Sequence, residues 1–216
     1  MSLPWSLAVP YSVAAIFHTL QGEGAQTGRP AVFLRLAGCN LWSGREADRA
    51  DAACAFCDTD FQPTARYADA DALADAVAAC WAKQTADRAH ACVVVTGGEP
   101  LLQLDRALLD ALHARGFFVA VESNGTLAAP AGLDWLCISP KAGAPLVQTA
   151  GDELKVVWPQ AGLDLSALEA LDFRWFFLQP VDHPDHPDAT DACLAVCRAR
   201  PRWWLSVQVH KHLGLP

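Results

Sequence analysis

Three of the chain's eight cysteines, Cys39, Cys54 and Cys57, stand together in one segment with the spacing C-x14-C-x2-C. They follow an apolar run at residues 31–36 that predicts a strand buried on both faces. A structural zinc site normally has four protein ligands, and an electron-transfer [4Fe–4S] cluster has four cysteine thiolates. A set of three therefore leaves one coordination position open, where an iron atom could bind a substrate or cofactor directly.

The other five cysteines lie in apolar segments, where a cysteine usually packs as a small hydrophobic side chain. They are Cys80, Cys92, Cys137, Cys193 and Cys197. A disulfide framework is not expected, because the chain is too long to need one and shows no secretion signal. Cys193 and Cys197 are spaced to share a metal on one helix face, but their apolar neighbours favour packing. A thioredoxin-like role for Cys54 and Cys57 lacks the surrounding fold pattern.

Polar residues collect directly after several of the predicted strands. In parallel α/β architectures, ligands bind at the carboxyl ends of the strands, so we expect these residues to share one site. The segments are Gly97-Gly98-Glu99, Ser123-Asn124-Gly125, Ser139-Pro140-Lys141 and Gln179-Pro180.

Short apolar runs alternate with longer helical patterns, as in βα units that build a mostly parallel sheet. Leucines at 101, 104, 108 and 112 repeat at helical spacing, as do apolar residues over 73–81, and Gly116 should end the later helix. A complete eight-stranded barrel typically needs about 250 residues. We therefore predict an α/β fold, an incomplete and partly open (β/α) barrel, as a single domain over residues 1–216. The predicted strands cover residues 12–19, 31–36, 92–96, 117–122, 135–139, 154–158, 174–178 and 204–209.

Composition narrows the class of ligand. The formal charge is -8, with 52% hydrophobic residues. Binding to nucleic acid or to an anionic membrane surface needs clustered Lys and Arg, so neither partner is expected and a small-molecule substrate fits better. No apolar stretch approaches the roughly 20 residues that span a bilayer, and no signal peptide is apparent. These features predict a cytoplasmic protein.

The cysteine segment resembles that of radical S-adenosylmethionine (SAM) enzymes, which carry three cysteines in the loop after the first barrel strand. Their usual spacing is C-x3-C-x2-C, so residues at about 40–53 look like an insertion in the cluster loop. Phe56, before the third cysteine, and the Gly-Gly-Glu-Pro motif at residues 97–100 also fit that superfamily. The resemblance implies a [4Fe–4S] cluster on the three cysteines, with SAM bound at the open iron.

Within this superfamily the chain resembles the 7-carboxy-7-deazaguanine synthase family over nearly its whole length. The resemblance implies that 6-carboxy-5,6,7,8-tetrahydropterin is converted to 7-carboxy-7-deazaguanine with release of ammonia, in queuosine and 7-deazapurine biosynthesis. The implied mechanism starts with reductive cleavage of SAM and removal of a hydrogen from C6 of the pterin. The hydrogen returns after ring contraction, so SAM is not consumed. The motifs are Gln21-Gly22-Glu23-Gly24, residues 33–39, Cys57-Asp58-Thr59, residues 96–100, Ser139-Pro140-Lys141 and residues 208–211.

The resemblance also implies roles for individual residues. It implies a Mg2+ ion beside the substrate, held with help from Thr59, and contact between the substrate and the carboxylate of Pro216. A homodimer and a reducing protein such as flavodoxin are expected as partners. The SAM contacts implied are Phe56, Gly98, Glu99, Ser123, Asn124, Ser139, Lys141 and Gln179. The pterin contacts implied are Gln21, Gly22, Glu23, Arg35, Thr96, His210 and Pro216.

Two of these residues can be argued independently of the resemblance. An arginine within an apolar strand is costly unless it is paired, and Arg35 could pair either with a substrate carboxylate or with a buried glutamate. His210 would extend the polar face that Ser206 and Gln208 give to the strand predicted over 204–209, although a solvated sheet edge explains this face equally well.

Plain structural explanations compete for two other features. Residues 58–60, Asp-Thr-Asp, could form a simple turn without a metal. Leu213 and Leu215 could anchor the last residues of the chain, with Gly214 providing the bend, but a frayed tail is the alternative. The His- and Pro-rich segment 183–187 is read as a loop before a helix capped by Asp188.

Two other functions remain open at this point. The chain could be a radical SAM enzyme that installs a glycyl radical on a partner protein, although such enzymes usually have C-x3-C-x2-C and lack the Gln-Gly-Glu-Gly segment. It could also be a non-catalytic module that binds zinc or a cluster. A SAM-cleavage assay on reconstituted protein separates that module from an enzyme.

Overall fold

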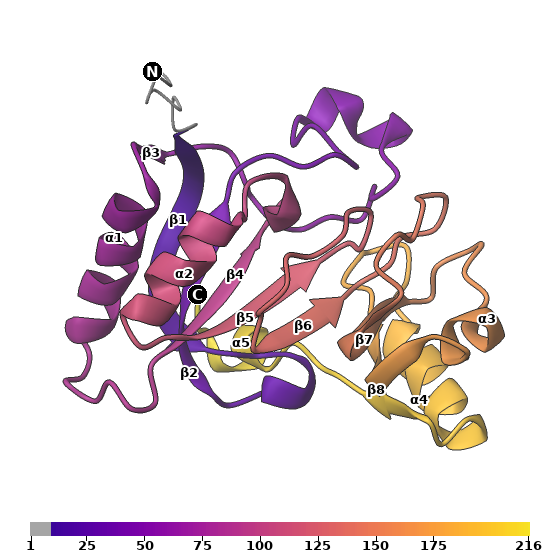
Figure 1. The fold of residues 1–216 in the computed structure, drawn as a ribbon. Coiled ribbons are helices and arrows are strands. Elements are labelled where there is room, and N and C mark those ends of the chain that lie inside the picture. Colours follow the sequence, from indigo (N-terminus) through magenta and orange to yellow (C-terminus); the bar gives the residue numbers. More distant parts are fainter. Residues whose placement is uncertain (1–9) are drawn as a thin grey trace.

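The computed structural model describes residues 10–216, which form one nine-stranded sheet in the order β3-β1-β2-β4-β5-β6-β7-β8-β9. Neighbours from β2 to β9 are parallel, while β1 runs antiparallel to both β2 and β3 (Figure 1). The sheet has free edges at β3 and β9, so the predicted partly open α/β architecture is confirmed. The strands are β1 (Tyr11–Leu20), β2 (Pro30–Leu36), β3 (Ala65–Tyr67), β4 (Cys92–Gly97), β5 (Phe118–Ser123), β6 (Trp135–Ile138), β7 (Ala150–Trp158), β8 (Asp172–Pro180) and β9 (Trp203–Leu205).

Helices α1, α2 and α4 share one face of this sheet. Helix α1 packs on β1 and β2, α2 packs on β5, and α4 packs on β8 and β9. Asp69 and Asp105 begin α1 and α2 by accepting backbone N–H groups, as expected of N-cap carboxylates. The helices are α1 (Ala70–Ala82), α2 (Arg106–Ala114), α3 (Leu165–Glu169), α4 (Ala189–Ala199) and α5 (Val209–Leu213), and the short 3-10 helices are η1 (Gly24–Gln26), η2 (Glu46–Asp51) and η3 (Pro100–Leu102).

Side chains that alternate along the strands divide between two apolar clusters. Val93 and Val95 of β4 face the helices and join the main core, whereas Cys92 and Val94 face the concave side with Ala120. The concave side is apolar near the start of β4. Polar residues that line the main cavity gather toward the carboxyl ends of the strands.

Two sequence predictions of regular structure were wrong in part. Strand β9 ends at Leu205, and helix α5 begins at Val209, so His210 lies on a helix and not on the polar face of a strand. The expected helix over residues 101–112 is divided into η3 and α2, because Asp105 caps a new helix there. Gly116 does follow the end of α2, with the positive φ of 81° that glycine adopts easily.

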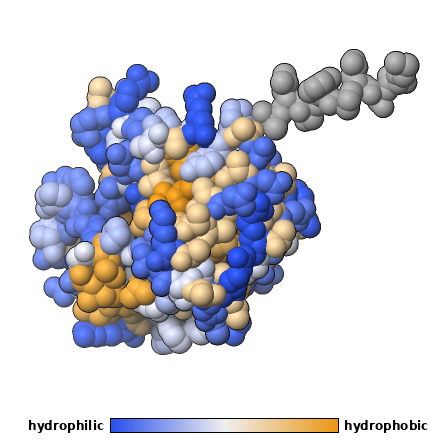
Figure 2. Space-filling model, turned by 90° about the vertical axis from the view of Figure 1, so that its left-hand side faces the viewer, coloured by the Kyte–Doolittle hydropathy of each residue, from blue (hydrophilic) through white to orange (hydrophobic). Residues whose placement is uncertain are grey.

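The surface on the α1 side is mixed: hydrophilic side chains alternate with apolar ones, and apolar residues gather near the upper centre and at the lower left (Figure 2). Among residues 10–216, Trp204 is the largest exposed apolar side chain, at 53% exposure. No helix within residues 10–216 is long and apolar enough to span a membrane.

Candidate active site

A cavity of about 330 Å³ opens at the carboxyl ends of the strands. It is lined by every residue that the sequence assigned to the cluster, SAM, the pterin or Mg2+, with the exception of Glu99. Residues at or just after the ends of β4, β5, β6 and β8 meet there, as the parallel topology predicts. The assigned lining residues are Gln21, Gly22, Glu23, Arg35, Cys39, Cys54, Phe56, Cys57, Thr59, Thr96, Gly98, Ser123, Asn124, Ser139, Lys141, Gln179, His210 and Pro216.

The three clustered cysteines lie on one wall of this cavity. A hydrogen bond from the Cys54 thiol lowers the pKa of Cys57 to about 6, and the same contact raises the pKa of Cys54. Within residues 10–216, no three His, Cys, Asp or Glu side chains converge on a single metal position. A cubane cluster does not require such convergence, because each thiolate binds a different iron atom. The donor set therefore fits a [4Fe–4S] cluster better than a mononuclear site.

The inserted segment between Cys39 and Cys54 folds back onto the cysteine loop. Arg49, in η2, donates hydrogen bonds from Nη1 to the carbonyl oxygens of Ala55 and Cys57, at 2.7 and 3.0 Å. The same guanidinium lies 4.2 Å from the centre of the Trp42 ring, which is buried. The insertion thus supplies a cation that holds the backbone on both sides of the third cysteine.

Gly98 and Glu99 both shape the cavity. Gly98 lines it, whereas Glu99 does not. A Cβ atom on Gly98 would collide with the backbone oxygen of Gly38 and with Cys39, so glycine allows β4 to approach the cysteine loop. The Glu99 carboxylate is fully buried and accepts hydrogen bonds from Leu101 N, Ser123 Oγ and Asn124 N. Burial raises its pKa despite these donors. Glu99 therefore lies behind the cavity wall and fixes the strand ends that line it.

Lys141 brings a buried positive charge near the cysteines. Its Nζ donates to the carbonyl oxygen and to the hydroxyl of Ser139, at 2.6 and 2.7 Å. Burial lowers the pKa of Lys141, while the nearby Cys54 and Cys57 oppose that shift. On the far wall, Gln179 accepts a hydrogen bond from Ser206 at 3.1 Å and keeps its amide N–H groups for other partners.

Arg35 is the cation on the β2 side of the cavity. Its Nε is buried and has no hydrogen-bond partner among residues 10–216. The arginine ion pairs within that range involve other arginines, so the pairing with a buried glutamate is not found. Its guanidinium carbon lies 5.5 Å from the centre of the Phe17 ring. The buried Nε–H group of Arg35 is therefore available to donate a hydrogen bond to a bound anion.

Opposite Arg35 lies an acidic group that the sequence only partly revealed. Glu23 was expected, but Glu122 and Lys155, which also line the cavity, were not assigned from the sequence. Glu122 is the next-to-last residue of β5, directly before Ser123, and Lys155 interrupts the apolar run of β7. A charged residue within an apolar strand was the signal that pointed to Arg35, and the same signal would have found both.

The C-terminal segment covers one side of the cavity. Val209 N donates to the oxygen of Gly22, and a Cβ on Gly22 would collide with the His210 ring. Lys211 pairs with Asp58 of the cysteine loop and with Asp182 after β8, at 2.6 and 2.5 Å. These contacts bring α5 against the part of the cavity wall that contains Gly22 and Asp58.

Two expectations for the end of the chain had different outcomes. Gly214 has a φ of 64° and ends α5, so it provides the expected bend. The anchoring role expected of Leu213 is wrong, because its side chain is 60% exposed. Pro216 nevertheless reaches the cavity wall.

The remaining candidate metal ligands lie away from this cavity. Cys193 is buried in the main core, with Cys197 packed against it, as the packing interpretation predicts. The segment containing His183 and His186 is a loop before α4, and Asp188 stands at the N-cap without a side-chain hydrogen bond.

No family profile matches the chain. Individual proteins described as 7-carboxy-7-deazaguanine synthase are nevertheless similar to it over nearly their full length. The Bordetella pertussis protein is 57% identical over 211 residues, covering 95% of this chain and 99% of that protein. The Caulobacter vibrioides protein is 58% identical over 211 residues, with the same coverage.

A solved structure gives the same result. The crystal structure of QueE from Escherichia coli matches this fold with a TM-score of 0.68 at 28% identity, covering 93% of this chain and 95% of that chain. The open sheet is thus the partial barrel of the radical SAM type that the sequence predicts. The identities and the coverage together show that the chain belongs to the 7-carboxy-7-deazaguanine synthase family.

Proposed function

We propose that this protein is a radical SAM lyase that converts 6-carboxy-5,6,7,8-tetrahydropterin to 7-carboxy-7-deazaguanine with release of ammonia. The observation that carries this substrate is the buried, unpartnered Nε of Arg35 in the cavity wall. A substrate carboxylate would satisfy this guanidinium through two parallel hydrogen bonds. The acidic residues on the other side suit the N–H groups of the pterin ring.

A [4Fe–4S] cluster would be held by Cys39, Cys54 and Cys57, and its fourth iron would be left for SAM. Reduced, it supplies the electron that cleaves SAM and begins the radical reaction. Residues at the strand ends, among them Ser123, Asn124, Ser139, Lys141 and Gln179, would bind SAM next to that iron. We assign Glu99 to fixing these strand ends from behind, since its oxygens already accept three hydrogen bonds.

The protein's own contribution is to orient the pterin and to exclude water. Arg35 would fix the carboxylate end of the substrate, and Gln21, Glu23 and the Gly22 backbone would contact the ring from the loop after β1. His210 and Pro216 would close the cavity from the C-terminal side. Held in this way, the pterin would be oriented before the reaction begins, so that little freedom is lost during the reaction.

The function is tested by incubating anaerobically reconstituted, reduced protein with SAM and the pterin, and by analysing the products by mass spectrometry. We expect 7-carboxy-7-deazaguanine and ammonia in equal amounts. Cleavage of SAM without this product would contradict the proposal and would favour a glycyl-radical activating enzyme.

The inserted segment should stabilise the cluster. Replacing Arg49 with methionine removes the hydrogen bonds to the carbonyls of Ala55 and Cys57, so the cysteine loop should open more often. We expect iron loss to a chelator to become several-fold faster. The matched control is Arg45→Met, because Arg45 lies in the same segment but is exposed and contacts only Asp48 by an ion pair. Equal rates of iron loss in both variants would show that the hydrogen bonds from Arg49 do not stabilise the cluster.

Mg2+ is proposed to bind at Thr59 together with substrate oxygens, since Mg2+ prefers hard oxygen ligands and retains several waters. The Thr59 hydroxyl lines the cavity and has only a long contact, 3.5 Å, to Asp58. We expect Thr59→Ala to weaken activation by Mg2+, with Thr59→Ser close to wild type, in titrations of turnover against Mg2+. Identical titration curves for Thr59→Ala and wild type would leave Thr59 as a turn residue.

We also propose two protein partners. The cluster needs an external electron, which a reducing protein such as flavodoxin would deliver. A second copy of the chain would form a homodimer, and the exposed Trp204 at the β9 edge is the kind of apolar side chain that an interface covers.

A further inference from the structure

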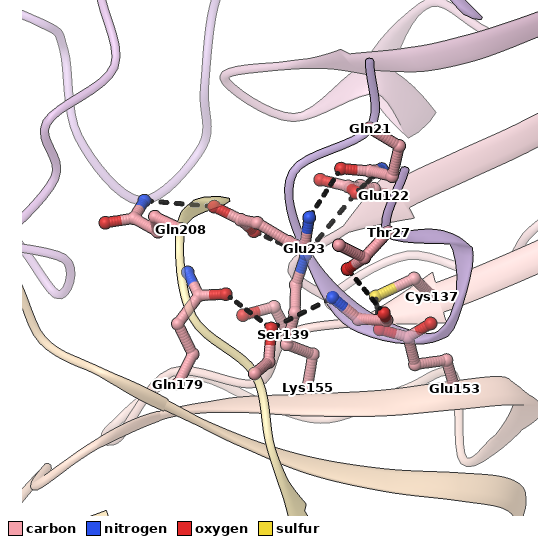
Figure 3. Close-up of polar contacts among 12 residues, drawn as sticks. Gln21, Glu23, Thr27, Glu122, Cys137, Ser139, Glu153, Lys155, Gln179 and Gln208 are labelled. Atoms are coloured by element: carbon pink, nitrogen blue, oxygen red, sulfur yellow. Dashed lines mark hydrogen bonds and ion pairs between the residues drawn. The ribbon is translucent and has the colours of Figure 1, made fainter. Parts of the chain in front are cut away.

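Lys155 is a buried ammonium group held between two carboxylates. Its side chain is 4% exposed, and Nζ lies 2.6 Å from Glu23 Oε2 and 3.3 Å from Glu122 Oε1. Figure 3 shows Lys155 rising from β7 toward Glu23, with Gln21 and Glu122 on one side and Gln208 on the other. The group joins β5, β7, the loop after β1 and the segment before α5.

The hydrogen bonds of this group leave one carboxylate oxygen for a ligand. Glu23 accepts from Lys155 on Oε2 and from Gln208 on Oε1. Glu122 accepts from Gln21 and Lys155 on Oε1, whereas its Oε2 receives no hydrogen bond from any residue in the range 10–216. Because Glu122, Glu23 and Lys155 all line the cavity, the group presents fixed acceptors to whatever binds there.

The Lys155 charge explains why Glu23 can stay ionised although it is largely buried. Burial alone would raise the pKa of Glu23, but the Lys155 ammonium, helped by Gln208 and His210, lowers that pKa to about 2. Glu122 and Glu23 in turn hold the pKa of Lys155 well above its usual value against the opposing effect of burial. Cys137 and Glu153 also face this lysine, and burial raises the pKa of both.

We propose, on the basis of the proposed function, that Lys155 is a positioning residue for the pterin. Its ammonium group holds the carboxylates of Glu23 and Glu122 in place through direct contacts, so that they accept hydrogen bonds from the substrate's N–H groups. Lys155 acts through these two acids and not on the reacting carbon. It should therefore govern pterin binding more than SAM binding.

The test compares Lys155→Met, which keeps the length of the side chain, with Lys155→Arg, which keeps the charge. The control is Lys83→Met, at the exposed end of α1. For Lys155→Met we expect the KM for the pterin to rise at least about tenfold, as for loss of hydrogen bonds to a charged acceptor. The KM for SAM should stay within about twofold, because none of the residues assigned to SAM contacts Lys155.

The pH dependence separates this role from a merely structural one. Without the ammonium, burial raises the pKa of Glu23, so a larger fraction is protonated at low pH and fewer acceptors remain. The ratio of the pterin KM in Lys155→Met to that in wild type should therefore fall as the pH rises. Titration of the free substrate is common to both proteins, so its effect cancels in this ratio. Lys155→Arg should give a smaller ratio that is independent of pH.

Wild-type protein provides a second measurement if Lys155→Met fails to fold. Infrared difference spectra on pterin binding at mildly acidic pH should show no protonated carboxyl band from Glu23, where a band from this residue is identified by its loss in Glu23→Gln. Such a band would overturn the proposal, as would a pH-independent KM ratio for folded Lys155→Met. Absence of pterin turnover in reconstituted wild type would instead refute the proposed function itself.

Discussion

Replacing Cys39, Cys54 or Cys57 with alanine, one at a time, is expected to remove the bound iron and abolish turnover. All three sulfurs lie on the wall of one cavity, and a cluster with only two protein thiolates would be poorly held. Iron content, the optical spectrum of the cluster and SAM cleavage in reconstituted protein measure the effect. The loss should be complete for each variant, since no other cysteine lines this cavity within residues 10–216.

Cys80→Ala is the matched control for these variants. Cys80 is partly buried on α1 and packs against the main core, far from the strand ends that form the cavity. Its loss should lower stability slightly and leave iron content and turnover at the wild-type level. Full iron content in Cys54→Ala, or loss of iron in Cys80→Ala, would contradict the assignment of the cluster ligands.

Arg35→Lys is expected to lower kcat/KM for the pterin by at least about 100-fold, since two charge-assisted hydrogen bonds contribute about 1.5–3 kcal/mol each. Lysine keeps the positive charge but cannot donate two parallel hydrogen bonds to a carboxylate. The effect should appear mainly in KM, while SAM binding stays near wild type. Steady-state kinetics with the pterin and equilibrium binding of SAM measure the two effects separately.

Arg106→Met provides the comparison, because Arg106 is exposed on α2 and pairs with Asp110 at 2.8 Å. Arg106→Met should leave both kcat/KM for the pterin and the affinity for SAM unchanged. A pterin analogue that lacks the carboxylate should bind wild type and Arg35→Lys equally weakly. If Arg35→Lys loses affinity for that analogue to the same extent as for the pterin, the arginine is structural.

Much of the fold follows from apolar periodicity. The run at residues 92–96 predicts β4 closely because a parallel strand covered on both faces is apolar throughout. The end of the chain was harder, since the alternation over 204–209 fits a strand, yet β9 has only Trp203–Leu205. Contacts of Ser206 with Gln179 and of Gln208 with Glu23 draw this segment toward the cavity, and such long-range contacts leave no local signal.

The prediction of the candidate site was most successful for residues whose type and position in the sequence both point to one kind of ligand binding. Cysteine spacing and polar strand ends brought the lining residues to one place, but they did not reveal that Glu99 is fully buried behind it. Lys155 and Glu122 carry the same signal as Arg35, a charge within an apolar strand, but this signal alone does not show which residues pair. Their partnership depends on the order of β5, β6 and β7 in the sheet, which is a tertiary property.

The central claim is tested most directly by following product and SAM together in reconstituted, reduced wild-type protein, with the pterin in large excess over SAM. If the cavity returns the abstracted hydrogen after ring contraction, 7-carboxy-7-deazaguanine should accumulate well beyond the amount of SAM, with little 5′-deoxyadenosine. Consumption of one SAM for each product would contradict the catalytic role of SAM. Consumption of SAM with no deazaguanine would contradict the assignment of the pterin to this cavity.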